Sequence, residues 1–138
     1  MLNPGSPAEV RAFFRDAWAA VRAGRPLTPL QDLVAGVIAL HPEVHGLIED
    51  PDLLARDDPD TSAAFLHLSL HVAVNEAISA DRPPGTRAIH EAMLARGLDR
   101  LAAEHRMIEV LHAALETAAR TGLPPDPEAV LAAWRRLA

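Results

Sequence analysis

The chain has 138 residues, of which 49% are hydrophobic, and a formal net charge of −6. This is the size of one domain, large enough to bury a core without disulfides. The absence of cysteine excludes disulfide frameworks, thiolate metal sites and cysteine nucleophiles. No apolar run approaches the ~20 residues of a membrane span, and the negative charge disfavours nucleic acid, whose phosphates demand a basic face. We therefore expect one domain over residues 1–138, with neither nucleic acid nor membrane as a partner.

The N-terminal residues and the basic residues limit the location and the chemistry of the protein. The N-terminal residues 1–6 lack the basic and apolar regions of a signal peptide, so we expect a cytoplasmic protein. Every one of the 13 basic residues is arginine, and tyrosine is also absent. A Schiff-base lysine, a phosphate-loop lysine and a tyrosine acid are therefore excluded.

Helix start signals divide the chain into segments. Ser6-Pro7-Ala8-Glu9 is a capping box with proline at the first helical position, and it predicts a helix that ends at Gly24. Thr28-Pro29-Leu30-Gln31 repeats this pattern and opens a helix that Pro42 stops or kinks. No strand-like alternation persists, so the sequence predicts an all-α fold, a single bundle of five to six helices. The remaining segments are a short helical piece over 42–48, an acidic loop over 49–60, and helices over about 62–79, 86–96, 99–121 and from 127 onward.

Histidines occur at a spacing typical of metal ligands. The chain has seven, and His41/His45 and His67/His71 are each four residues apart. Residues four apart on a helix lie one above the other, so two imidazoles placed in this way can bind one metal ion. The run Phe65-Leu66-His67-Leu68-Ser69-Leu70-His71 is apolar on nearly all sides, which is typical of a buried helix. A stripe of His67, His71 and Asn75 on such a helix should face a polar feature inside the bundle.

The predicted helix over 99–121 carries a third candidate pair. His105 and Glu109 lie four residues apart beside an apolar stripe of leucine and isoleucine, where an imidazole and a carboxylate would complete a metal site. His112 lies three residues beyond Glu109, the spacing found in carboxylate-bridged di-iron bundles. The simpler interpretation makes His112 a surface residue paired with a glutamate, and His90 a hydrogen-bonded core residue.

Several of these motifs together resemble a known family. The motifs are His41-Pro42-Glu43-x-His45, the Phe65–His71 run, Pro83-Pro84-Gly85, Ala103-Glu104-His105-x-x-x-Glu109 and Thr121-Gly122-x-Pro124-Pro125. They make the chain similar to a bacterial family named domain of unknown function 1841, over nearly its whole length. The resemblance implies no activity, but its shared polar residues fall on the three pairs described above.

The leading hypothesis is a helical bundle that binds one or two transition-metal ions. The predicted ligands are His41, His45, His67, His71, His105 and Glu109. Imidazole-rich ligation without thiolates suits iron, zinc, manganese or nickel, and six ligands favour a dinuclear centre, above all di-iron. Its role would be oxygen chemistry, hydrolysis or sensing, and whether it is an enzyme stays open. One alternative is a metal-free interaction module or homodimer with a buried histidine hydrogen-bond network. Another is a metal-independent acid–base enzyme that uses His67 or His71.

Overall fold

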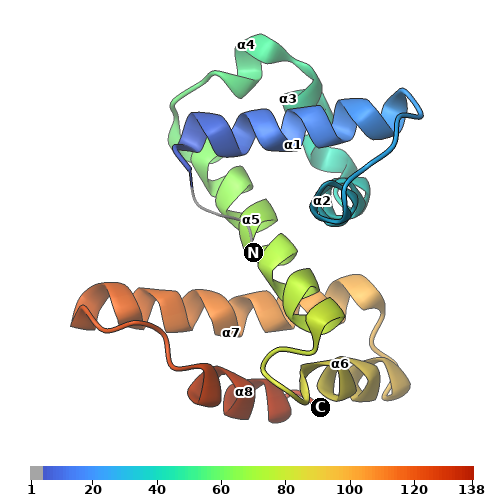
Figure 1. Ribbon diagram of the computed structural model, residues 1–138. Coiled ribbons are helices and arrows are strands. Elements are labelled where there is room, and N and C mark those ends of the chain that lie inside the picture. Colours follow the sequence, from blue (N-terminus) through green and yellow to red (C-terminus); the bar gives the residue numbers. More distant parts are fainter. Residues whose placement is uncertain (1–4) are drawn as a thin grey trace. The chain divides into compact units, whose positions relative to one another are not determined.

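A computed structural model describes residues 5–138 of the protein (Figure 1). These residues form eight α-helices and one 3-10 helix without a strand, which confirms the all-α fold. The expected number of five to six helices was too low. The first four residues, on which the signal-peptide argument partly rests, lie outside the described part. Within residues 5–138, no helix has both the length and the apolarity to cross a membrane.

Backbone contacts divide the chain into two compact units. One unit ends at Val72, and the other spans Ala73–Ala138. Helix α5 (Pro59–Ala80) contributes residues to both units, and each unit is described by itself below. The expectation of a single domain stays a prediction.

The first unit is built on the capping signals of the sequence. Ser6 Oγ accepts a hydrogen bond from the Glu9 amide, and Thr28 and Gln31 form a complete capping box. Helix α1 packs against α2 and α3 (Figure 1). Together with the first part of α5, these elements bury a core that includes Phe14, Ile38 and Leu68. The elements before α5 are α1 (Pro7–Arg22), α2 (Pro29–Ala39), η1 (Pro42–Val44), α3 (His45–Glu49) and α4 (Pro51–Leu54).

The acidic segment over 49–60 is more helical than we predicted. The Asp50 carboxylate accepts hydrogen bonds from the amides of Asp52 and Leu53, and Pro51 occupies the first helical position, so one turn of helix forms as α4. Helix α5 begins at Pro59 rather than 62, with Asp58 accepting the Thr61 amide. Both corrections have the same physical reason. Asp50-Pro51 and Asp58-Pro59 are helix start signals, but they lie in a stretch whose acidic composition led us to predict a loop.

The second unit comprises the end of α5 with α6 (Thr86–Ala95), α7 (Arg100–Thr121) and α8 (Pro127–Arg135). Helix α7 packs against both α6 and α8. The indole nitrogen of Trp134 donates to the carbonyl of Met107 over 3.1 Å, which ties α8 to α7 inside the core. The bounds of α6 and α7 confirm the helices predicted over 86–96 and 99–121 to within a residue.

The turn between α5 and α6 is held by one carboxylate. Asp81 adopts a positive φ of 51°, and its carboxylate accepts hydrogen bonds from the amides of Gly85 and Arg87. The Arg87 amide, followed by the Gly85 amide and the Arg87 charge, lowers the pKa of Asp81 below its usual value of 3.8. The Arg87 side chain in turn donates to the carbonyls of Ile78 and Ser79 at the end of α5.

Candidate metal centre

The His41-Pro42-x-x-His45 segment caps the end of α2. Pro42 has no N–H, so the carbonyl of Ile38 lacks its usual donor four residues on. The Ile38 carbonyl accepts instead from the His41 amide over 3.0 Å and from His45 Nε2 over 2.8 Å, and His41 Nδ1 donates to the carbonyl of Val37, also over 2.8 Å. Because a peptide carbonyl only accepts, both imidazole bonds fix the ring nitrogen that carries hydrogen. The spacing of these two histidines thus has a structural cause in addition to any ligand role.

This cap orients His41 toward α5. With hydrogen on Nδ1, the neutral ring of His41 presents a lone pair at Nε2, which lies 3.0 Å from Nε2 of His67. His67 must then donate the hydrogen of that bond. His41 is 3% exposed and His67 is half-buried, so the contact is mostly shielded from water.

His71 completes a group that we call the three-histidine cluster, made of His41, His67 and His71. The ring centroid of His41 lies 5.0 Å from that of His67 and 5.0 Å from that of His71, with the rings edge to face. The rings of His67 and His71, one turn apart on α5, are 6.0 Å apart. His71 is fully buried. A ring nitrogen of each histidine lies within 4.8 Å of the other two, which is close enough to hold one metal ion.

The distances can be compared with those around a real ion. Two imidazole nitrogens about 2.05 Å from a tetrahedral zinc ion stand ~3.3 Å apart, and at a right angle they stand ~2.9 Å apart. The 3.0 Å between His41 and His67 falls between these values. An ion would therefore change the distance between these two nitrogens by only a few tenths of an ångström, while the rings would turn so that both lone pairs meet at the ion.

Of the other three predicted ligands, His45 has partners of its own in the first unit, and His105 and Glu109 belong to the second unit. The ring of His45 packs on Trp18, with 4.5 Å between centroids, while its Nε2 hydrogen is used by Ile38. His105 is half-buried and Glu109 exposed on α7 of the second unit. The structure thus brings His41, His67 and His71 together within the first unit. Ligation by His45, His105 or Glu109 stays a prediction.

A second polar group lies inside the second unit, and the sequence argument did not identify it as a group. The Glu104 carboxylate, 1% exposed, accepts hydrogen bonds from Asn75 Nδ2 and Arg100 Nε, both over 2.8 Å, and contacts His90 Nε2 at 3.2 Å. Arg100 also donates to Asn75 Oδ1. We call these four residues the carboxylate network. His90 is thus a hydrogen-bonded, largely buried residue, as expected.

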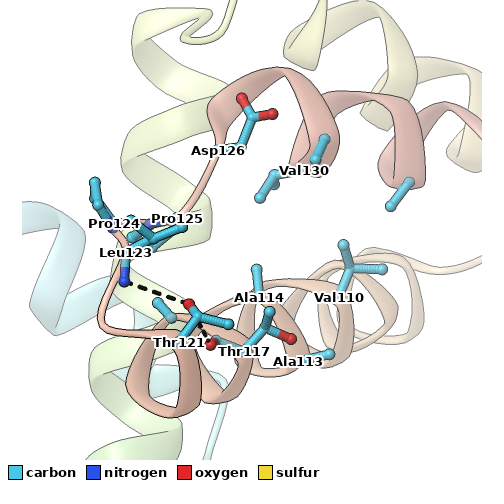
Figure 2. Close-up of a pocket in the computed structure, with 13 residues that line it drawn as sticks. Val110, Ala113, Ala114, Thr117, Thr121, Leu123, Pro124, Pro125, Asp126 and Val130 are labelled. Carbon is cyan, nitrogen blue, oxygen red and sulfur yellow. Dashed lines mark hydrogen bonds between the residues drawn. The ribbon is translucent and has the colours of Figure 1, made fainter.

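On the exposed part of α7, His112 is a surface residue beside a glutamate, as the simpler interpretation predicted. His112 lies 3.6 Å from Glu116, with both side chains about half exposed or more. Nearby, α7 and α8 border a cavity of about 450 Å³ (Figure 2). Its walls are mainly the small side chains of alanine, valine and threonine, and Leu123 beside it is 67% exposed. Thr121 and Asp126 at its rim are already hydrogen-bonded to backbone amides, so the groove presents chiefly apolar surface.

Comparison with known proteins gives a family and no function. A family model described as a domain of unknown function (DUF1841) matches residues 6–136, nearly the whole chain. Neither the curated proteins nor the solved structures contain a match.

Proposed function

The chain belongs to the DUF1841 family, and we propose that the function of its three-histidine cluster is to bind a transition-metal ion. One observation carries this proposal. His41 donates its Nδ1 hydrogen to a backbone carbonyl and turns the lone pair of Nε2 toward Nε2 of His67. Metal-binding histidines almost always donate their second ring N–H in this way, because the bond fixes the tautomer and the ring orientation.

The proposed ligand set is smaller than the sequence suggested. His41, His67 and His71 form its centre, and we add His105 on its sequence pattern alone, as a half-buried histidine within a family motif. We leave out His45, because its ring packs on Trp18 and it does not belong to the group of ring nitrogens within 4.8 Å of one another, and Glu109, because it is exposed. Without the carboxylate that usually bridges two irons, the proposed centre holds one ion.

The donor atoms limit which metal ion the site would prefer. Neutral imidazole suits zinc and iron(II), whereas manganese prefers carboxylate oxygen. The three histidines of the cluster alone leave one position open on a four-coordinate ion, as in catalytic zinc sites; with His105 as a fourth ligand, a position stays open only on a five- or six-coordinate ion. Oxygen chemistry, hydrolysis and sensing of a small ligand are the three roles that such an open position would serve.

A second candidate function has an observation of its own. The 3.0 Å contact of His41 and His67 is a complete hydrogen bond without any ion. Under this alternative the cluster is a buried hydrogen-bond network that fixes α2 against α5, in a metal-free interaction module or homodimer. The two candidates differ in one respect that is simple to measure, namely whether the protein retains metal.

The test is elemental analysis of untagged protein purified without chelator. We expect near-stoichiometric zinc or iron in the natural protein and less than a tenth of that amount in the double variant His67→Ala/His71→Ala. His112→Ala is the matched control, because it removes an exposed histidine and should leave the metal content unchanged. Circular dichroism of each variant shows whether helicity is intact.

The outcomes separate the two candidates. Protein that carries no metal and takes up none from added zinc or iron(II) would refute the proposal and favour the hydrogen-bond network. If metal binds, His105→Ala tests the fourth ligand: a weaker affinity supports the sequence-based assignment of His105, and an unchanged affinity removes it from the set.

A further inference from the structure

We infer that a metal ion in the three-histidine cluster takes a small exchangeable anion, such as hydroxide, a carboxylate or azide, as a further ligand. This inference rests on the proposed function. It follows from the charge of the ligands. Among residues 5–72, the buried polar side chains are His41, Thr61 and His71, all of them neutral groups when histidine binds metal. A divalent ion held by three imidazoles therefore keeps its full double positive charge.

Such a charge is costly where the cluster lies. His41, 3% exposed, lies just beyond the end of α2 and its core residues Val37 and Ile38. His71, 0% exposed, directly precedes the core residue Val72 on α5. An uncompensated ion in apolar surroundings loses most of its hydration energy. An anion bound directly to the metal halves the net charge, so burial strengthens the attraction between the two.

The carboxylates of the first unit are poorly placed to supply this charge. Glu43, two residues after His41, is exposed, and the exposed Glu49 already binds the Trp18 indole and Arg22. The buried carboxylate of the second unit, Glu104, has its own cation in Arg100 at 2.8 Å. Glu76, half-buried on α5, follows His71 by five residues and so lies about 140° round the helix from it. We therefore expect the anion to come from solution.

The coordination sphere has room for it. Three imidazoles leave one position on a four-coordinate ion and more on a five- or six-coordinate one. A fourth imidazole from His105 would leave the net charge unchanged and would still leave a position on the larger coordination spheres. His67 is only half-buried, so one edge of the cluster meets solvent and a small anion has a way in.

The test uses cobalt(II) as the metal and azide as the anion. Cobalt(II) is added to chelator-treated protein, and its visible absorption bands are followed while sodium azide is titrated in. We expect a saturable shift of the bands. In acetate at its own half-saturation concentration, the azide needed for half-saturation should about double, because both anions compete for one position. The variant Glu109→Gln should give the same azide curve.

Each result decides a different claim. Cobalt(II) that binds without responding to azide or acetate would overturn the anion site and leave the proposed metal function standing. An azide response that first appears in Glu109→Gln would also overturn it, because the chain's own carboxylate would then fill the position. Failure to bind cobalt(II), zinc or iron(II) at all would instead overturn the proposed function itself.

Discussion

The carboxylate network offers the sharpest test of the energetics of the second unit. In Glu104→Gln, the amide oxygen still accepts from Asn75, but an N–H2 group now faces the donor nitrogen of Arg100. Replacing the charged carboxylate by a neutral amide weakens the buried bond from Asn75 and lowers the free energy of unfolding by about 1 kcal/mol. The Arg100 pair adds no more than ~1 kcal/mol, because the Arg100 side chain is 52% exposed and water replaces its partner. The weaker His90 contact at 3.2 Å adds a few tenths. We expect a total loss of about 2 kcal/mol in the free energy of unfolding.

The assay can be confined to the second unit. The chain has two tryptophans, Trp18 in the first unit and Trp134 in the second. In a Trp18→Phe background, the fluorescence of Trp134 during urea unfolding reports on the second unit alone. Glu109→Gln is the matched control, because it makes the same chemical change at an exposed site on the same helix and should cost less than about 0.5 kcal/mol in chelator-containing buffer. If the two variants unfold within ~0.5 kcal/mol of each other, the network does not stabilise the unit as we argue.

Three further predictions follow from the structure. Zinc at 100 times its dissociation constant should raise the free energy of unfolding by about 2.7 kcal/mol, and urea titrations should show no such gain in His67→Ala/His71→Ala. His45→Phe keeps a ring against Trp18 but removes one of the two donors to the Ile38 carbonyl, which keeps the His41 amide, so urea unfolding should show a loss of about 0.5 to 1 kcal/mol; a loss near zero would refute the capping role. The pKa of Asp81 is lowered on folding, so its carboxylate stabilises the protein above about pH 4 and this contribution is lost as the pH falls through the folded pKa. The difference in melting temperature between the natural protein and Asp81→Asn should therefore shrink below about pH 3, and a constant difference would contradict this.

The helices were predictable where their start signals are local. Ser6 and Thr28 cap the two helices predicted from their capping boxes. Asp99 and Asp126 cap the helices predicted to start near residues 99 and 127. The Asp50-Pro51 turn carries the same kind of signal and was missed because the surrounding acidic residues suggested a loop. Local chemistry thus determined most of the secondary structure, including the part that was wrongly predicted.

The site was less predictable because burial depends on tertiary packing. Glu109 was chosen as the important carboxylate of α7, yet Glu104 is the buried one. A signal for Glu104 was present, since it lies three residues after Leu101 and four before Ile108 and so shares the apolar stripe. Its partner Arg100 lies four residues before it, a spacing typical of helical ion pairs. No periodicity could have shown that Asn75 would meet Glu104, because that contact joins two helices.

The two candidate functions finally differ in the position of one hydrogen. In the metal-free network, His41 keeps its hydrogen on Nδ1 and His67 must carry hydrogen on Nε2 to donate to it. If both Nε2 atoms bind an ion, His67 must instead carry its hydrogen on Nδ1, while His41 changes nothing. Nitrogen-15 NMR of the histidine rings should therefore show a tautomer change at His67 and none at His41 when zinc is added. A change at His41 would break its bond to Val37, and it would mean that the helix cap does not orient the metal ligand.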